Sequence, residues 1–437
     1  SGSNNTSVGA CSLDSLTTAS SNTAIGFCSL QANSTANSNT AVGCGALKLT
    51  TTGCFNTAVG DAALRDNTTG DNNVAVGCGA LANNETADAN TAIGFKSLVS
   101  TTTGCQNTAL GLCTMTQNIT GDGNVAVGYN ALFCNNGSTP DFNTALGRQA
   151  MYSNTTGTLN AAVGVNAMYS NTTGANNTVM GRNSFYANTT GSDNTAYGSE
   201  ALRLATTAAS NTAIGRQAMC KTTDGHSNTA VGAFSLCANT TADYNTAVGV
   251  EALKAQTTGI SNVSVGYYSL VKSTTGACNV AVGVQSGDEI TSGLCNTLLG
   301  NFAGDNITTG ARNVIIGKSS HPSAADGTDQ SVIGHDISGK GNETFTAGGT
   351  GGVFNENNTT AWQQTSDRRI KKNIVDNNIG LDKITQIQVR DFEYRTLDEI
   401  TDFDTDDNRK AAVVNIKGVQ IGAIAQEIEK VFPELVI

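Results

Sequence analysis

One short pattern of polar and apolar residues recurs along most of the chain. The pentapeptide Asn-Thr-Ala-Val-Gly, or a close variant, returns with a fixed spacing as far as Gly334. The glycines of the first four units are Gly9, Gly26, Gly43 and Gly60. Each step equals one 17-residue unit, except for a step of 19 between Gly128 and Gly147, which gives 20 units in all. Such a period is typical of proteins that stack one short structural unit many times.

Within each unit the residue order predicts one short strand followed by turns. The Thr-x-Val segment alternates as a strand does, and the later Thr-Thr-Gly segment is typical of a turn. Glycines, β-branched residues and the absence of apolar spacings of three and four disfavour a helix. We therefore predict an all-β fold over residues 1–338, a parallel β-solenoid or β-roll of 17-residue rungs. Strands stacked ~4.8 Å apart would make a rod roughly 95 Å long.

A polar column accompanies the glycine column. The residue four before each glycine is Asn in 19 units and Gln330 in the last. Its first members are Asn5, Asn22, Asn39 and Asn56. In a stack of rungs these amides would hydrogen-bond along a ladder. A binding surface would vary from rung to rung, so we expect both columns to be structural.

The apolar positions are expected to form a core and a packing face. The residue before the glycine is always apolar, from Val8 to Ile333, and the fourth residue after it is Leu, Met or Phe from Leu13 to Leu270. We expect these two columns to fill the coil. Alanines two before and three after the glycine form a small flat face, which we expect to pack against two neighbouring copies.

Two irregularities interrupt the repeat. Residues 135–140 carry the two-residue insertion, which we expect to lengthen one loop without breaking the register. Later, Gly287 and Gly304 replace the Leu of the rung, so we expect the cross-section to change there.

Variable positions are the better candidates for ligand binding. In the middle third they carry aromatic and arginine side chains near the positions one to two and five to seven after the glycine. These residues are Tyr129, Phe133, Arg148, Tyr152, Tyr169, Arg182, Tyr186, Arg203 and Arg216.

The twelve cysteines all lie in the repeat region. Three pairs share a phase in adjacent rungs: Cys11 with Cys28, Cys220 with Cys237, and Cys278 with Cys295. Parallel Cβ vectors are a poor geometry for a disulfide, so we expect free, half-buried thiols. No Cys/His cluster has metal-ligand spacing, and we predict neither a metal nor another cofactor.

Charge and composition exclude several functions. The net charge of −11 argues against nucleic-acid binding, which needs Lys and Arg to neutralise phosphates. The chain contains no run of 18 apolar residues, so we predict no membrane insertion. Glycan cleavage needs paired carboxylates in a groove, whereas Asp61, Glu200 and Glu251 lie in isolated rungs. Because the chain starts at Ser1 rather than Met, we expect that an upstream part exists.

The composition changes abruptly after the repeats. A Gly-rich stretch, predicted to be a linker over residues 339–365, leads into charged sequence from Ser366 onward. The segment Ser-Asp-Arg-Arg-Ile-Lys-Lys-Asn-Ile at 366–374 resembles the opening motif of the endosialidase-type intramolecular chaperones, which are self-cleaving C-terminal domains of phage tail spikes and fibres. Residues 422–436 resemble the second signature of that family. We expect residues 366–437 to be the N-terminal part of a small α+β domain of this kind, without its helical tail.

This resemblance implies a trimerising chaperone that is released by one internal cut. Carried over by position, the cut lies between Thr365 and Ser366, with Ser366 as nucleophile and Lys371 as general base. Asp367 and Asn373 would orient the site. The alternative is structural: Ser366 caps a helix, and Asp367 favours its N-terminus. We expect this Ser-Lys dyad to cleave its own chain at most once, and we do not expect the protein to be an enzyme with multiple turnovers.

The pentapeptide also resembles the repeats of trimeric autotransporter adhesin heads, which are left-handed parallel β-rolls packed as trimers. The two resemblances together imply a homotrimeric tail fibre of a phage or virus that binds a host-surface glycan or protein receptor. The expected location is a virion appendage or an extracellular surface. The alternative function is an exported cell-surface adhesin or extracellular filament.

Overall fold

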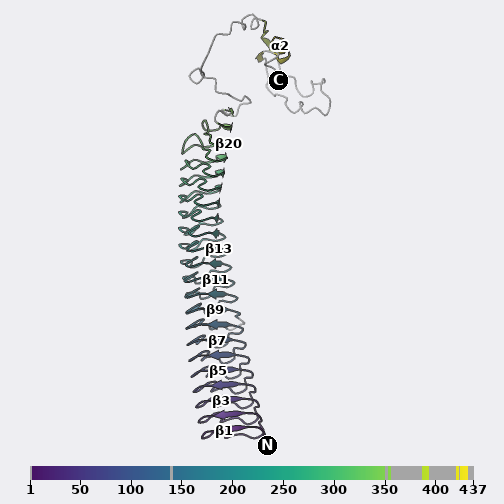
Figure 1. The fold of residues 1–437 in the computed structure, drawn as a ribbon, viewed down its shortest axis with the longest axis vertical. Coiled ribbons are helices and arrows are strands. Elements are labelled where there is room, and N and C mark those ends of the chain that lie inside the picture. Colours follow the sequence, from purple (N-terminus) through teal and green to yellow (C-terminus); the bar gives the residue numbers. More distant parts are fainter. Residues whose placement is uncertain are drawn as a thin grey trace, which may run out of the picture. The chain divides into compact units, whose positions relative to one another are not determined.

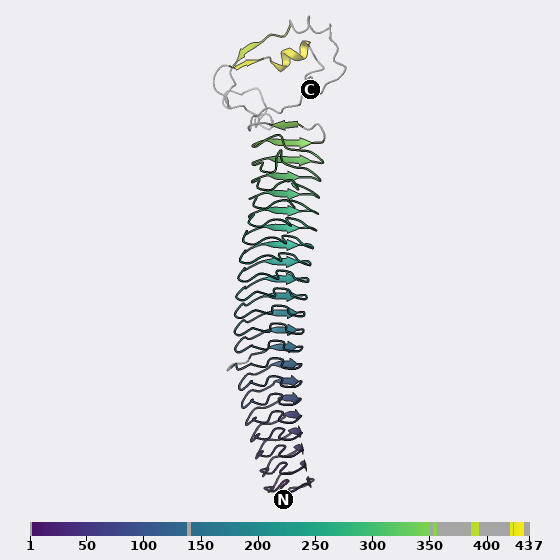
Figure 2. The same cartoon turned by 90° about the vertical axis from the view of Figure 1, so that its left-hand side faces the viewer.

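The chain divides into two units, Ser1–Thr365 and Ser366–Ile437. The computed structural model describes residues 2–137, 141–349, 353–355, 386–392, 420–422 and 424–431. The first unit is the predicted parallel β-solenoid, and in Figures 1 and 2 its strands form one column from the purple N-terminal end to the green end. The predicted fold class is therefore confirmed.

Each rung contributes one short strand to a single parallel sheet. Residues in the same phase of adjacent rungs pair, as Thr6 with Thr23, and the pairing continues across the insertion, where Val125 pairs with Thr144. The strands are β1 (Thr6–Val8), β2 (Thr23–Ile25), β3 (Thr40–Val42), β4 (Thr57–Val59), β5 (Val74–Val76), β6 (Thr91–Ile93), β7 (Thr108–Leu110), β8 (Val125–Val127), β9 (Thr144–Leu146), β10 (Ala161–Val163), β11 (Thr178–Met180), β12 (Thr195–Tyr197), β13 (Thr212–Ile214), β14 (Thr229–Val231), β15 (Thr246–Val248), β16 (Val263–Val265), β17 (Val280–Val282), β18 (Thr297–Leu299), β19 (Val314–Ile316) and β20 (Ser331–Gly334). The insertion therefore leaves the strands in register.

The turns of a rung adopt left-handed backbone at three non-strand positions. In the fourth rung these are Phe55 (φ 59°), Ala62 (φ 55°) and Leu64 (φ 50°). β-branched residues are strongly disfavoured at positive φ. The sequence places no Val, Ile or Thr at these three positions in any of the 20 rungs, so the turn geometry explains a restriction that the repeat pattern alone leaves unexplained.

The glycine column marks the closest approach of neighbouring backbones. Gly60 has φ 138°, and a Cβ built on it would lie 2.6 Å from the carbonyl oxygen of Gly77. Glycines in the same phase have the same surroundings along the stack, for example Gly215 against Gly232 at 2.5 Å. A side chain at this position would force adjacent rungs apart.

The core differs from the prediction in which side of the strand is buried. Ala41, Ala46 and Leu47 are fully buried, whereas Val8 is 57% and Ile25 40% exposed. Strand residues alternate between two faces, so in a three-residue strand only the middle residue points inward. The Leu column fills the coil as predicted, but the column that begins at Val8 does not. The expectation that the alanine face packs against neighbouring copies is also wrong, because the alanines line the interior.

The asparagine column is buried and links every rung to the next. The backbone N–H of Asn56 donates to Oδ1 of Asn39 at 2.9 Å, and Nδ2 of Asn56 donates to the carbonyl of Gly70 at 2.8 Å. Each amide thus satisfies one donor of the following rung and one carbonyl of a turn. Buried polar groups need such partners, which explains why this position tolerates so little variation.

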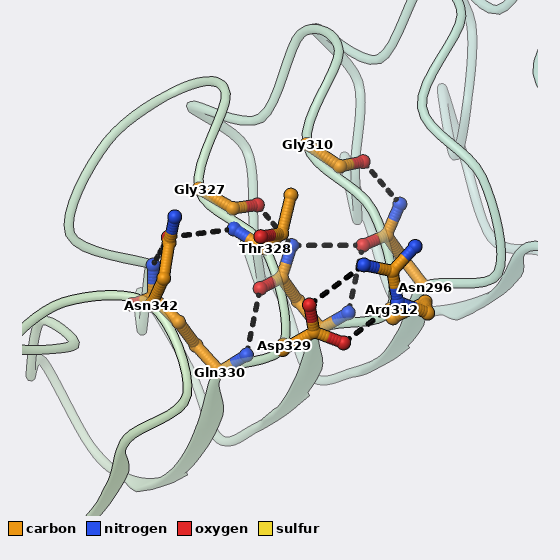
Figure 3. A network of polar contacts seen from close by, with 9 residues as sticks. Asn296, Gly310, Arg312, Gly327, Thr328, Asp329, Gln330 and Asn342 are labelled. Carbon is orange, nitrogen blue, oxygen red and sulfur yellow. Dashed lines mark hydrogen bonds and ion pairs between the residues drawn. The ribbon is translucent and has the colours of Figure 1, made fainter. Parts of the chain in front are cut away.

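The ladder ends in a separate polar network (Figure 3). The backbone N–H of Gln330 donates to Oδ1 of Asn313 at 3.1 Å. Its side-chain Nε2 then donates to Asn342 Oδ1 at 3.3 Å, and the same oxygen accepts the N–H of Thr328 at 2.9 Å. Asn342 therefore supplies an acceptor at the place where the regular repeat ends.

The interior is repacked where Gly287 and Gly304 replace leucine. A Cβ on Gly287 would lie 2.6 Å from Leu298 Cδ1 and 3.1 Å from Ile290 Cδ1. Leu298 occupies the usual alanine position, and Ile290 occupies a position that is Asn in many rungs. Apolar volume has moved from one side of the coil to the other, which keeps the interior filled while the strand register continues.

Beyond β20 the stack gains two irregular strands. β21 (Phe345–Gly348) pairs in parallel with β20 at a shorter offset, Ser331 opposite Phe345. β22 (Val353–Asn355) then pairs antiparallel with β21. Both strands lie within the stretch predicted as a Gly-rich linker.

The second unit contains a small antiparallel pair and one short helix among its described residues. β23 (Arg390–Phe392) pairs with β24 (Gln420–Gly422), and α2 spans Ala425–Val431. The Arg390 guanidinium contacts the Glu427 carboxylate of α2 at 2.9 Å. Within the part of the chain that the structure describes, no helix has the length and apolarity needed to cross a membrane.

We expect Gly60→Ala to destabilise the solenoid on the order of 3 kcal/mol, because it combines backbone strain with overpacking against Gly77. Gly45→Ala is the matched control: Gly45 also has positive φ (65°), but nothing lies within 4 Å of a Cβ placed there, and we expect a loss of about 1 kcal/mol. Denaturant unfolding and hydrogen exchange in the neighbouring rungs measure both. Equal losses would contradict the close backbone approach.

Candidate functional site

The outward residues of β1 to β20 form a continuous surface, here called the strand face. It consists of two columns, one residue before and three residues before each glycine. The first column is apolar in all 20 rungs, the second is Thr, Val, Ala or Ser, and neither contains a charged residue. Its more exposed members include Val8, Ile25, Leu110, Leu146, Met180, Ile214 and Leu299.

The strand face is a long uncharged surface. Twenty rungs ~4.8 Å apart and two strand positions ~7 Å across give roughly 600 Å². Its apolar column makes up about half of that area, and a contiguous apolar patch of a few hundred Å² is large enough to mark an interaction site. The strand face is therefore the strongest candidate contact surface among the described residues.

Four aromatic side chains of the predicted variable positions form a stack. Phe133, Tyr152, Tyr169 and Tyr186 lie in consecutive rungs with ring centroids 5.1 Å apart. Their planes are within 10° of parallel, so each inner ring has both faces occupied by its neighbours. Burial raises the pKa of the Tyr152 hydroxyl. The stack contributes packing between rungs and leaves ring edges, rather than ring faces, toward solvent.

The other variable positions form separate polar and cation–π contacts. Arg182 pairs with Glu200 at 3.2 Å, and the Arg216 guanidinium lies 5.0 Å from the ring centre of Phe234. Tyr129 and Arg148 are exposed, as is Arg203, which follows the aromatic stack in its column. The structure therefore spreads the nine predicted candidates over several local contacts instead of one site.

A second asparagine ladder runs inside the coil and was missed in the sequence. Nδ2 of Asn188 donates to Oδ1 of Asn171 at 2.6 Å and to the carbonyl of Gly191 at 3.1 Å. These asparagines stand seven positions after the glycine, where Thr, Ser, Gln or an apolar residue sometimes replaces them. The signal was present as Asn-Thr-Thr, which also reads as a glycosylation motif. Full burial of Asn171 and Asn188 assigns them to the interior.

The insertion brings one carboxylate into this inner ladder. Asp141 is fully buried, and its Oδ2 accepts hydrogen bonds from Asn135 Nδ2 at 2.8 Å and Asn124 Nδ2 at 3.2 Å. Its Oδ1 has no hydrogen-bond partner in the described structure. Burial raises the pKa of Asp141, although the two asparagine hydrogen bonds oppose that shift and Asp122 adds to it.

All twelve cysteines lie in described rungs and are free thiols. The described residues contain no group of three or more His, Cys, Asp or Glu side chains that could hold a metal ion.

The predicted self-cleavage residues lie outside the described residues. They belong to the stretch 356–385, which lies between β22 and β23 and includes Thr365, Ser366, Asp367, Lys371 and Asn373. Their roles stay predictions.

Comparison with known proteins identifies the second unit. Residues 366–437 match the sequence profile of the family described as Chaperone of endosialidase. The suspected family is therefore confirmed for this part of the chain. Comparisons with curated proteins and with solved structures found no match.

We expect Asp141→Asn to stabilise the protein at pH 7. Because the pKa of Asp141 is raised in the folded state, its carboxyl favours folding below the unfolded pKa of ~3.9 and opposes it as the pH rises through the folded pKa. The gain in melting temperature over wild type should therefore grow between pH 4 and pH 7. Asp88→Asn, at an exposed carboxylate of the same phase, is the control. A gain that does not change with pH would contradict this assignment.

Proposed function

We propose that this chain forms the shaft and chaperone module of a trimeric fibre in a phage or virus tail appendage, which attaches the particle to a host surface. The observation that carries the proposal is the order of parts. A chaperone-of-endosialidase segment follows a 20-rung solenoid whose strand face carries a continuous apolar column.

The strand face supports association with two further copies of the chain. Three parallel copies would each cover the same apolar columns around one axis, as closed cyclic symmetry requires. The apolar column is about half of the strand face, so burying roughly 300 Å² of it at ~25 cal/mol per Å² would contribute on the order of 8 kcal/mol per copy, before the cost of association. The absence of charge from both columns means that no ion is desolvated by this contact.

A shaft of this kind has a physical need for a registering module. Neighbouring rungs are so alike that a slip of one rung between copies changes few contacts. Register is weakly specified where the residues in each phase are the same. A C-terminal module that joins three chains before the shaft closes would fix the register and limit the time during which strand edges are exposed.

The same module is proposed to cut itself off once. Ser366 Oγ would attack the carbonyl of Thr365, and Lys371, in its neutral form, would accept the proton of the serine hydroxyl. The C–N bond between Thr365 and Ser366 would then break, with the Ser366 amine taking that proton from Lys371, which leaves an ester between the two residues. Water would hydrolyse the ester to give the Thr365 carboxylate and the free Ser366 hydroxyl. Asp367 and Asn373 would hold the nucleophile and the base in place. Family membership of residues 366–437 supports this assignment.

Surfaces that stay exposed in the trimer would then bind the host. Tyr129, Arg148 and Arg203 are exposed and lie in columns that vary between rungs, so they suit recognition of a host glycan or protein. The location that fits is a virion appendage.

We expect the wild-type protein to be a trimer and the double variant Ile214→Asp/Val231→Asp to lose it. Two charges per chain would have to be desolvated in adjacent rungs of the strand face, so the trimer should dissociate at least tenfold more readily. Sedimentation velocity measures the change. Thr173→Asp/Thr190→Asp, on exposed turns of adjacent rungs, is the matched control and should stay trimeric. A monomeric wild type would contradict the proposal.

For the self-cleavage we expect wild-type protein to yield two bands on a denaturing gel, corresponding to residues 1–365 and 366–437. Ser366→Ala and Lys371→Met should each leave the full-length band. Lys372→Met is the control, since the neighbouring lysine has no assigned role, and it should cleave as wild type does. Cleavage that persists in Ser366→Ala would remove the nucleophile assignment, without bearing on the trimer.

A further inference from the structure

One pair of thiols lies in direct contact across two rungs. Cys220 Sγ and Cys237 Sγ are 2.7 Å apart. Both residues stand five positions after their glycine, in the column that continues from the aromatic stack. The two rungs are tied at this point by a backbone hydrogen bond from the Lys221 N–H to the Cys237 carbonyl at 3.1 Å. The two cysteines are therefore held side by side by the stack itself.

The spacing of the rungs suits a covalent link. Stacked strands lie ~4.8 Å apart, which falls within the Cα separation that disulfides span, and an S–S bond is ~2.05 Å long. Closing the bond needs a movement of under about 1 Å in the sulfur atoms. Parallel Cβ vectors were expected to disfavour such a bond, but the side-chain torsions bring these two sulfurs together.

The contact with Cys220, together with two nearby lysines, favours a thiolate at Cys237. Lys221 is adjacent to Cys220 in sequence, and Lys254 stands one rung further along the column, where its ammonium also pairs with Glu251 at 3.0 Å. The hydrogen bond from Cys220, with these two lysines, lowers the pKa of Cys237 to about 7, and burial opposes the shift. The same hydrogen bond raises the pKa of Cys220. Arg203 occupies the preceding position of the column.

The other same-phase pairs differ in their surroundings. Cys278 and Cys295 are both exposed, and Cys11 is exposed while Cys28 is buried. Burial, as the leading cause, raises the pKa of Cys278 and of Cys28. Cys220 and Cys237 are both half-buried, and theirs is the pair in which one thiol is shifted toward the thiolate.

We propose that Cys220 and Cys237 form an oxidisable pair, a modification site at which a small-molecule disulfide of the glutathione class closes a disulfide between adjacent rungs. The Cys237 thiolate attacks one sulfur of the oxidant, and the oxidant's S–S bond breaks to release one thiolate. The Cys220 thiol then loses its proton and attacks Cys237 Sγ, which expels the second thiolate. One protein disulfide forms, and one molecule of oxidant is reduced to two thiols.

The bond would act as a staple in the middle of the shaft. It closes a loop of one rung, so local opening of these two rungs would have to keep their sulfurs joined. A shaft that folds under reducing conditions would acquire the bond only on meeting an oxidant, because thiols persist in reducing compartments and disulfides in oxidising ones. This inference depends on the thiol geometry alone and does not require the proposed attachment function.

The test is a peptide map of the full-length folded protein after exposure to glutathione disulfide. Trypsin cuts after Arg216, Lys221 and Lys254, so a Cys220–Cys237 bond joins the peptides 217–221 and 222–254. We expect this linked pair to form at least tenfold faster than a Cys278–Cys295 bond, which lies inside the single peptide 273–312 and is detected as its loss of a pair of hydrogens. Its rate should rise with pH up to about 7 and then level off, following the Cys237 thiolate. A slower or absent link would overturn the proposal.

Single variants separate the redox role from a packing role. Cys220→Ala should leave Cys237 as a stable mixed disulfide with glutathione, while Cys237→Ala should slow the reaction of Cys220. Alanine already occupies this column at Ala82, so both variants should fold. Oxidation should raise the melting temperature of wild type and leave that of Cys220→Ala/Cys237→Ala unchanged. An equal rise in both proteins would also contradict the staple.

Discussion

The close contact of one glycine backbone with the next is the constraint on which the rest of this solenoid depends. Gly60 and Gly77 approach so closely that no Cβ fits between them. That approach fixes the rung spacing at the value that a parallel strand pair requires. With the spacing set, the backbone N–H of Asn56 reaches the side-chain oxygen of Asn39, and the side-chain Nδ2 of Asn56 reaches the carbonyl of Gly70. The asparagine ladder, the strands and the left-handed turns thus all depend on the same distance between adjacent rungs.

The 17-residue period predicts which residues stack on one another, but not which of their side chains point into the coil. It correctly predicted the strands, the parallel register and the survival of that register through the insertion, because residues in the same phase must stack. It did not predict which columns face inward. The column of Val8 was placed in the core because it is the most apolar, yet a strand of three residues buries only its middle position, and there Ala24 and Ala41 lie at full burial. The small interior of the coil, rather than hydrophobicity, decides that choice.

The second asparagine ladder and the residue restrictions in the turns are two features that the repeat consensus did not predict. Asn171 and Asn188 lie in Asn-Thr-Thr motifs, which are usually interpreted as exposed glycosylation sites. The sequence therefore did not indicate that these two side chains are buried. The exclusion of β-branched residues from the position of Leu64 became interpretable only through its φ of 50°. For the second unit, the identity of residues 366–437 was readable from two short motifs. The arrangement around Ser366 could not be derived, since a motif specifies residue types and not the positions of their atoms.

The exchange of apolar volume between Gly287 and Leu298, which lie in adjacent rungs, shows that the filling of the interior can change while the strand register continues. Every rung offers the same donors, acceptors and backbone surface above and below, whatever its interior contains. An added or deleted repeat would therefore meet matching contacts on both sides. The length of the solenoid can change by gene duplication or deletion in steps of a single coil, about 5 Å at a time, independently of the chaperone segment that follows it.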